Sequence, residues 1–242
     1  MKRALAVLLT CLAFQAKAEE TGPVPFSTAS PGEVLPAPWR FSAVPKVKKH
    51  TRYSLVEDAG ITVLRAEANA SMASLTHALK IDPNVLPVIN WRWKIDNLVD
   101  KSDPTSKDRD DFPARIYVLF DYDIRKLSFG TRTKIQMGRA LYGADIPVAA
   151  LCYVWDARLA RDTSMWSAYT DRVRVIVAES GAANVGRWVE LQRNVREDFR
   201  AAFGEDPPPI SGIAIATDTD NTGESVVAWY GDIRFLTGDA PK

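Results

Sequence analysis

"RIYVLF" at residues 115–120 and "RVRVIV" at residues 172–177 are the stretches that decide the fold class. In both, apolar positions alternate with mixed positions, which is the period of two that a half-buried β-strand requires. The period recurs along the chain and predicts strands at 52–56, 61–67, 88–95, 114–121, 149–155, 172–178, 188–192, 213–217 and 226–235, the last interrupted at Gly231. Asp58-Ala59-Gly60 predicts a hairpin turn between the first two strands.

Two stretches favour helices. In residues 194–203, Asn194 can cap the first turn with Glu197 three positions later, and Gly204 can end the helix. Residues 131–142, followed by Gly143, form a less regular second candidate. Many strands, two short helices and no strand-helix alternation predict a mainly β fold, an antiparallel, jelly-roll-like β-sandwich, and argue against a Rossmann fold or a barrel.

The first residues predict a secretory signal peptide over 1–18. Lys2 and Arg3 form a basic start, residues 4–14 are almost wholly apolar, and Ala16-Lys17-Ala18 places small residues where a signal peptidase cleaves, after Ala18. The apolar run is too short for a permanent membrane span. We therefore expect a periplasmic or secreted protein that is not embedded in a membrane. Its predicted parts are a proline-rich lead-in at 19–38, a single domain at 39–236 and a tail at 237–242.

Charge and cysteine content argue against a nucleic acid partner and against an internal disulfide. Loss of Lys2, Arg3 and Lys17 with the signal peptide changes the net charge from +1 to −2, which argues against a nucleic acid partner because phosphate binding needs a basic face. Only Cys152 remains after cleavage, so no internal disulfide can form. Its apolar surroundings predict a small buried hydrophobe.

The loop from Asp218 to Glu224 contains the pattern Asp-x-Asp-x-x-Gly. The favoured interpretation is a hairpin tip whose Asp and Asn side chains bond their own backbone. The alternative is a metal site, in which Asp218 and Asp220 surround a hard cation such as calcium with oxygen atoms. Trp229 stands where an EF-hand would need its bidentate acid, so an EF-hand is excluded.

A second acidic segment covers residues 96–111. Paired carboxylates there could act as acid and base on a glycosidic bond, could bind an ion or an oxygen-rich ligand, or could simply be solvated. Sequence alone leaves these alternatives open. The acidic residues are Asp96, Asp100, Asp103, Asp108, Asp110 and Asp111, with Arg115 nearby.

Trp91 and Trp93 lie two positions apart on one predicted strand and therefore on one face of its sheet. An exposed row would suit sugar stacking, but the accompanying Ile89 and Ile95 favour burial in the core. In that case Arg92 and Lys94 lie outside, where they could meet an anionic ligand.

Other chemistry has little support. His50 and His77 are the only histidines, neither has zinc-ligand spacing, and both are expected at the surface or at a sheet edge. No Gly-x-Ser-x-Gly elbow and no phosphate-cradling glycine loop occur.

The chain resembles the bacterial family catalogued as domain of unknown function 3047. The resemblance extends from about Trp39 to Phe235 and rests on "WRW" at 91–93, "DDFPARIYV" at 110–118, "YVW" at 153–155, "FGEDPP" at 203–208 and "IAIATDTDNTGESVVAWYGDI" at 213–233. It implies an exported bacterial protein and no established activity. The last stretch, at 230–235, is also similar to the final strand of jelly-roll carbohydrate-binding modules.

These observations lead to one main hypothesis: an exported domain that binds a polar ligand, such as a glycan or a cell-envelope saccharide. The ligand-binding residues are predicted to be Asp110, Asp111, Arg115, Asp218, Asp220 and Asn221, because they gather at strand ends, where sandwich loops meet. One alternative is a carbohydrate-active hydrolase or lyase that uses two of the acids. Another is an envelope scaffold without a small ligand.

Overall fold

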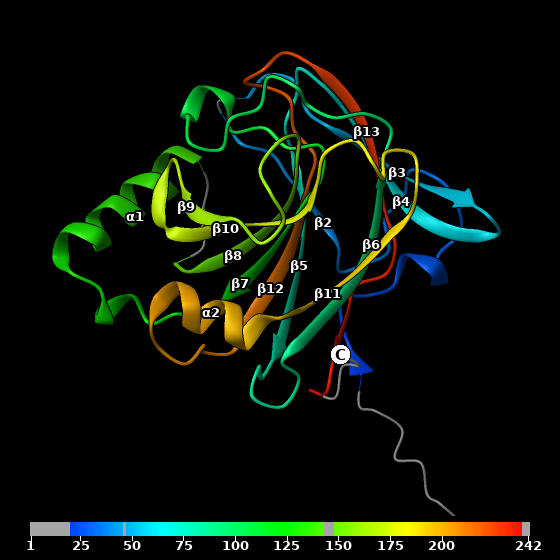
Figure 1. Ribbon diagram of the computed structural model, residues 1–242. Coiled ribbons are helices and arrows are strands. Elements are labelled where there is room, and N and C mark those ends of the chain that lie inside the picture. The colour runs from blue at the N-terminus through cyan, green and yellow to red at the C-terminus, as the bar shows by residue number, and fades with distance from the viewer. Residues whose placement is uncertain (1–19, 46, 143–147, 239–242) are drawn as a thin grey trace, which may run out of the picture.

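The computed structural model of the protein describes residues 20–45, 47–142 and 148–238. The predicted signal peptide and the end of the predicted tail lie outside these residues. Two seven-stranded β-sheets enclose the main hydrophobic core, to which both contribute side chains (Figure 1). The predicted β-sandwich is therefore confirmed. None of the described helices is long and apolar enough to cross a membrane.

The first sheet contains, in order, β1 (Glu20–Thr21), β14 (Arg234–Leu236), β6 (Val88–Ile95), β13 (Ser225–Tyr230), β4 (Ile61–Asn69) and β3 (Arg52–Asp58), with β11 (Val189–Asn194) paired to β6. The second contains β2 (Arg40–Ser42), β5 (Ser74–Ile81), β12 (Ile210–Ala216), β7 (Arg115–Phe120), β8 (Ala150–Asp156), β10 (Thr170–Ser180) and β9 (Ser164–Ser167). Most neighbours are antiparallel, as predicted, but β8 and β10 are parallel.

The strand period decides which side chains enter the core. On β6, Trp91 and Trp93 are fully buried, and each packs against an aromatic ring of β8 in the other sheet. Trp91 stacks on Tyr153 with 5.2 Å between ring centroids, and Trp93 lies 6.2 Å from Trp155. The predicted burial of this tryptophan row is confirmed. Arg92 and Lys94, which alternate with the tryptophans on β6, accordingly lie on the outer face of the first sheet.

The outer face of the second sheet carries a smaller apolar cluster. Cys152 and Val154 of β8 point away from the main core and pack with Phe112 and Val177. Burial raises the pKa of the Cys152 thiol to about 12, as expected for the small buried hydrophobe predicted at this position. Phe112 belongs to the segment that precedes β7, so this segment covers the sheet from outside.

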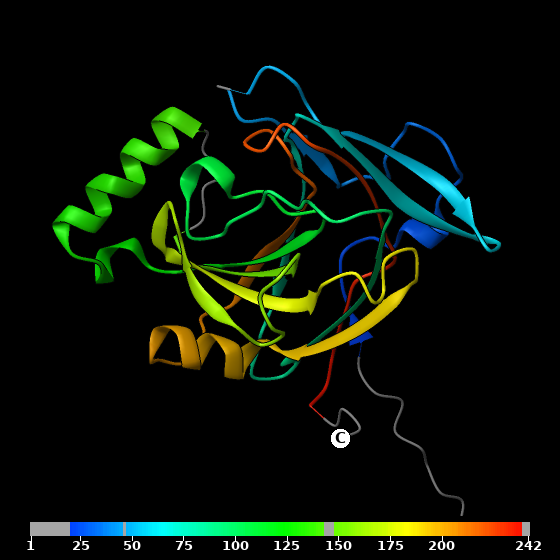
Figure 2. The ribbon, with the colours of Figure 1, turned by 45° about the horizontal axis from the view of Figure 1, so that its top comes forward.

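Helix α2 (Val195–Phe203) closes one end of the sandwich (Figure 1). The side chain of Asn194 accepts a hydrogen bond from the Glu197 backbone N–H at 3.1 Å, and Gly204 ends the helix in the left-handed conformation at φ +74°. Both predicted caps are confirmed. Phe199 buries its ring 4.5 Å from Phe120. Helix α1 (Phe129–Tyr142) projects away from the two sheets (Figure 2).

Local turn chemistry is also as predicted at the β3–β4 connection. Ala59 and Gly60 both have positive φ angles, of 51° and 79°, and Asp58 pairs with Ile61. This is the geometry of the two-residue turn that matches the twist of a hairpin. Short 3-10 turns complete the elements: η1 (Phe26–Thr28), η2 (Lys107–Arg109) and η3 (Ile124–Lys126).

The segment predicted to lead into the domain is packed against it. β1 pairs with β14, and the buried ring of Phe26 stacks on Trp39 with 5.0 Å between centroids. The same segment covers His77, whose Nε2 accepts a hydrogen bond from the Val24 backbone N–H at 3.0 Å. Of the two positions expected for His77, the surface or a sheet edge, the surface is wrong, because the neighbouring chain shields the side chain from solvent.

Candidate functional site

The strand register brings the two acid-bearing segments together. β7 and β12 are antiparallel neighbours, and Arg115 at the start of β7 lies opposite Ala216 at the end of β12. The residues before β7 and those after β12 therefore emerge at the same edge of the second sheet. Asp110 and Asp111 come from the first segment, and Asp218 comes from the second.

Arg115 is the centre of this edge. Its Nε donates to Asp218 Oδ1 at 2.8 Å, and its Nη2 bonds Asp218 Oδ2. Nη2 also donates to the backbone oxygen of Asp110 at 2.8 Å, and Nη1 donates to the Tyr117 hydroxyl at 3.0 Å. The guanidinium lies 4.7 Å from the ring centre of Phe112, which shields it. The buried arginine thus joins both segments to the sheet.

Asp111 fixes the shape of the loop after β12. Its Oδ2 accepts hydrogen bonds from the backbone N–H groups of Thr222 at 2.6 Å and Asn221 at 3.1 Å. Its Oδ1 accepts from the side-chain amide of Asn221 at 3.1 Å. These bonds satisfy donors of a turn in which Gly223 has φ +73°. The fully buried carboxylate therefore organises the loop from another segment of the chain.

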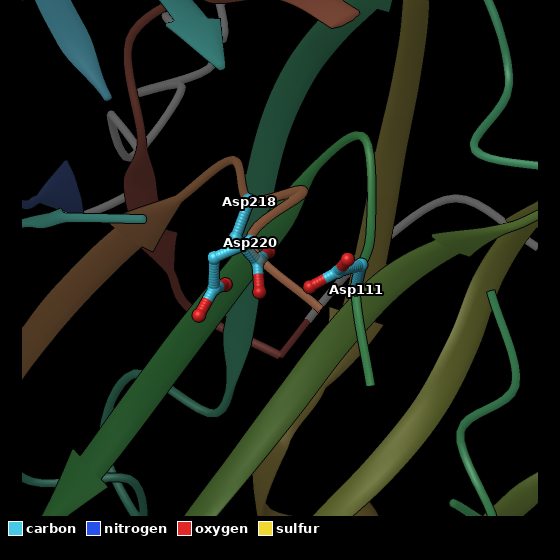
Figure 3. A group of neighbouring side chains, drawn as sticks. All are labelled: Asp111, Asp218 and Asp220. Carbon is cyan, nitrogen blue, oxygen red and sulfur yellow. The ribbon is translucent and has the colours of Figure 1, made fainter. Parts of the chain in front are cut away.

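Three carboxylates converge beside this turn. Asp111, Asp218 and Asp220 each place an oxygen within 4.8 Å of the others, and Figure 3 shows Asp111 approaching from the segment before β7 toward the other two. Asp110 lies beside the Arg115 guanidinium, with its Oδ2 3.8 Å from Nη1. Its other carboxylate oxygen, Oδ1, is buried and has no hydrogen-bond partner in the described part of the chain. Four carboxylates thus lie close together at this edge, and two of them, Asp110 and Asp218, contact Arg115.

Burial and the excess of negative charge raise the pKa values of two of these carboxyl groups. Burial raises the pKa of Asp110 to about 6, because desolvation outweighs the attraction of Arg115 and because Asp111 and Asp220 add repulsion. The pKa of Asp220 is also raised, first by burial and then by repulsion from Asp111. Chemically, such an arrangement can hold a proton or a hard divalent cation with oxygen ligands.

The structure brings together all six residues predicted to bind a ligand, and we call them the rim: Asp110, Asp111, Arg115, Asp218, Asp220 and Asn221. The first four are buried, whereas Asp220 is half-buried and Asn221 is exposed, so only the last two reach solvent. The remaining acids of residues 96–111 do not join them. Asp103, for example, accepts from the Thr105 backbone N–H at 3.0 Å and makes a local turn.

The favoured interpretation of the loop after β12 as a hairpin tip is wrong. β12 lies in the second sheet and β13 lies in the first, so the loop connects the two sheets. Asp218 bonds Arg115 and, at 3.4 Å, the Phe112 backbone N–H of another segment rather than its own backbone. Tyr117 is the rim contact that the sequence prediction missed. Its position two residues after Arg115, on the same strand face, was the available signal.

Comparisons with known proteins complete the description. The family 30 carbohydrate-binding module of the cellulosomal cellulase Cel9D-Cel44B of Clostridium thermocellum is similar in fold at 12% sequence identity and a TM-score of 0.39, with 91% of this chain and 100% of that chain covered. The cellulose induced protein Cip1 is similar at 9% identity and a TM-score of 0.31, with 81% and 89% covered. No curated protein matches the chain. A family model described as "Protein of unknown function (DUF3047)" matches residues 37–234.

Proposed function

We propose a function for this chain, which belongs to the DUF3047 family of proteins of unknown function: it is an exported domain that binds a saccharide at the rim. The observation that carries the proposal is the meeting of four carboxylates and one arginine where the segment before β7 joins the loop after β12. Asp220 and Asn221 are the members that a ligand reaches. The buried members hold these two in place.

The chemistry of the rim suits a ligand rich in hydroxyl groups. Carboxylate and amide oxygens accept hydrogen bonds from sugar hydroxyls, whereas the net negative charge of the rim repels phosphate-rich ligands such as nucleic acids. We further propose that calcium binds between Asp111, Asp218 and Asp220. Calcium takes six to eight oxygen ligands, so sugar hydroxyls would complete a coordination sphere that three carboxylates leave open.

A glycan array with and without calcium tests the proposal. Asp220→Asn keeps the size of the side chain but removes the charge nearest to solvent, and we expect it to abolish calcium-dependent binding. Asp108→Asn, at an exposed acid of η2, is the matched control and should bind as the unaltered protein does. Binding that is equal in both variants would show that the rim is not the saccharide site.

Export is part of the same proposal. Residues 1–18 have the features of a cleavable signal peptide, with small residues before the expected cleavage point. N-terminal sequencing of protein recovered from the periplasm should begin at Glu19. A protein that keeps Met1, or that remains in the cytoplasm, would contradict export and leave saccharide binding to be tested separately.

A hydrolase or lyase is the second candidate, and the pKa of Asp110 favours it. A carboxyl group with a pKa of about 6 beside other carboxylates has the property that a general acid needs at neutral pH. Release of reducing ends from a polysaccharide, lost in Asp110→Asn, would establish turnover. Binding without turnover would support the binding domain.

A further inference from the structure

The outer face of the first sheet carries a second polar surface, whereas the rim lies at an edge of the second sheet. β11 and β13 lie on either side of β6 (Figure 1), and the strand register places their outward residues opposite those of β6. Lys94 of β6 lies opposite Trp229 of β13, and Arg92 lies opposite Glu190 of β11. The core tryptophans alternate with these residues, so the opposite face of β6 is buried between the sheets.

A groove of about 480 Å³ opens on this face. That volume is in the range of small-molecule sites. It lies where β13 ends and β14 begins, and the β3–β4 turn forms one of its walls. Polar side chains dominate the lining, among them Asn90, Arg92, Glu190, Asp232 and Arg234.

Arg92 is held in the groove by packing. Its guanidinium stacks on the Trp188 ring at 4.6 Å from the centroid, and its aliphatic part lies against Gly231. A Cβ at Gly231 would come within 2.6 Å of both Cγ and Nε of Arg92, so only glycine leaves room for the side chain here. Packing against Trp188 and Gly231 therefore restricts the conformations that the Arg92 side chain can adopt.

The Arg92 guanidinium forms no ion pair and donates no hydrogen bond within the described residues, although Glu190 lies opposite it on β11. Its neighbour Lys94 differs, because Lys94 pairs with Asp58 and stacks on Trp229 at 4.6 Å. A conformationally restricted, unpaired guanidinium in a groove is suited to bidentate binding of a carboxylate.

The acceptors around Arg92 restrict the ligand further. Asp232 accepts hydrogen bonds from the backbone N–H of Ser27 at 3.1 Å and from its hydroxyl at 2.5 Å, and Glu190 accepts from Asn90 at 3.2 Å. These two carboxylates can accept further bonds from hydroxyl groups. They repel a second anionic group, so a polyanion with closely spaced phosphates does not fit.

We infer that this groove binds an acidic saccharide, with a uronate carboxylate on Arg92 and sugar hydroxyls on Glu190 and Asp232. The inference goes beyond the binding of saccharides at the rim, and it does not depend on calcium.

Calorimetric titration with methyl α-galacturonide, which carries a single carboxylate, in the presence of EDTA tests the inference. We expect this sugar acid to bind, and the neutral methyl α-galactoside and acetate to bind much more weakly, because the first lacks the charge and the second lacks the sugar. Loss of a charge-assisted bidentate contact in Arg92→Gln should weaken binding by about ten- to a hundredfold. Gly231→Ala should weaken it as well, by displacing the Arg92 side chain without removing its charge.

Arg40→Gln is the matched control. Arg40 is an exposed arginine on β2 of the second sheet, and its replacement should leave the affinity unchanged. Near-ultraviolet circular dichroism checks that each variant is folded. The inference is overturned if the unaltered protein does not bind methyl α-galacturonide in EDTA, if methyl α-galactoside binds as tightly, or if folded Arg92→Gln binds as Arg40→Gln does. Because calcium is absent, these results are independent of the test of the rim.

Discussion

Arg115 holds the carboxylate of Asp218 in a bidentate contact, with its Nε 2.8 Å from Oδ1 and its Nη2 bonded to Oδ2, across 103 positions of the chain. The pair is buried on the outer side of the second sheet, beneath Phe112. Because both charges are removed from water, each depends on the other to offset the free energy of desolvation. The contact therefore joins the segment before β7 to the loop after β12.

Arg115→Gln is expected to be strongly destabilising. The substitution leaves four carboxylates at the rim without a cation, and breaking a buried pair on one side lowers the free energy of unfolding by about 3–5 kcal/mol. Urea denaturation measures the change. The double variant Arg115→Gln/Asp218→Asn should recover part of the loss, because it removes the unpaired charge. Arg125→Gln, at an exposed pair with Asp123, serves as the control and should change little.

Stability should increase on mild acidification when calcium is absent. The Asp110 carboxyl has a pKa of about 6 in the folded protein and about 3.9 in an unfolded chain. Between these values the folded state holds a proton that the unfolded state has released, so the free energy of unfolding rises as the pH falls from 7 through 6 toward 4. A difference of about two pKa units corresponds to about 3 kcal/mol.

Comparison with Asp110→Asn isolates this contribution from the other acids. In EDTA, the difference between the two proteins should be greatest at pH 7, where Asp110→Asn lacks the buried charge and is the more stable. The difference should shrink by pH 4.5. Parallel pH profiles for the two proteins would rule out a raised pKa at Asp110.

Calcium should raise the thermal unfolding midpoint if the rim binds it. A ligand that binds only the folded state at a hundred times its dissociation constant adds about 2.7 kcal/mol. Differential scanning fluorimetry at pH 7 measures the shift, which Asp220→Asn should reduce. Magnesium should give a smaller shift, because it requires a tighter octahedral arrangement of oxygens. An equal shift in Asp220→Asn would place the calcium elsewhere.

Removal of the cap of α2 should cost about 1 kcal/mol. In Asn194→Ala the Glu197 backbone N–H loses its side-chain acceptor. Chemical denaturation should show the loss, and Asn194→Asp should largely retain the cap, because aspartate accepts the same bond. Equal losses in the two variants would mean that the residue acts through something other than capping.

The sequence predicted those parts of the fold that local chemistry determines. The caps of α2 and the turn at Ala59-Gly60 depend on residues that are close in the chain. The same is true of β6, whose alternation marks an inner and an outer face. By contrast, β5 was missed although its residues alternate, because His77, Ala78 and Lys80 have little preference for strands. The four-residue β9 is too short to show a period.

The features that the sequence did not predict depend on pairing between residues that are distant in the chain. β8 and β10 are parallel, which no local pattern indicates because parallel strands need a crossover connection. At the rim, the sequence identified the acids but not how far each is buried. Burial depends on Phe112 and its segment covering the outer face of the second sheet, and on the register that places Arg115 opposite Ala216.

Alternation along β6 has an evolutionary consequence. Trp91 and Trp93 are locked between the sheets, whereas Arg92 and Lys94, their immediate neighbours, project to the opposite side. A lineage could therefore exchange the outward residues and acquire a different specificity while the interior stays intact. On β6, the residues that maintain the fold are therefore different from those that can change the binding surface.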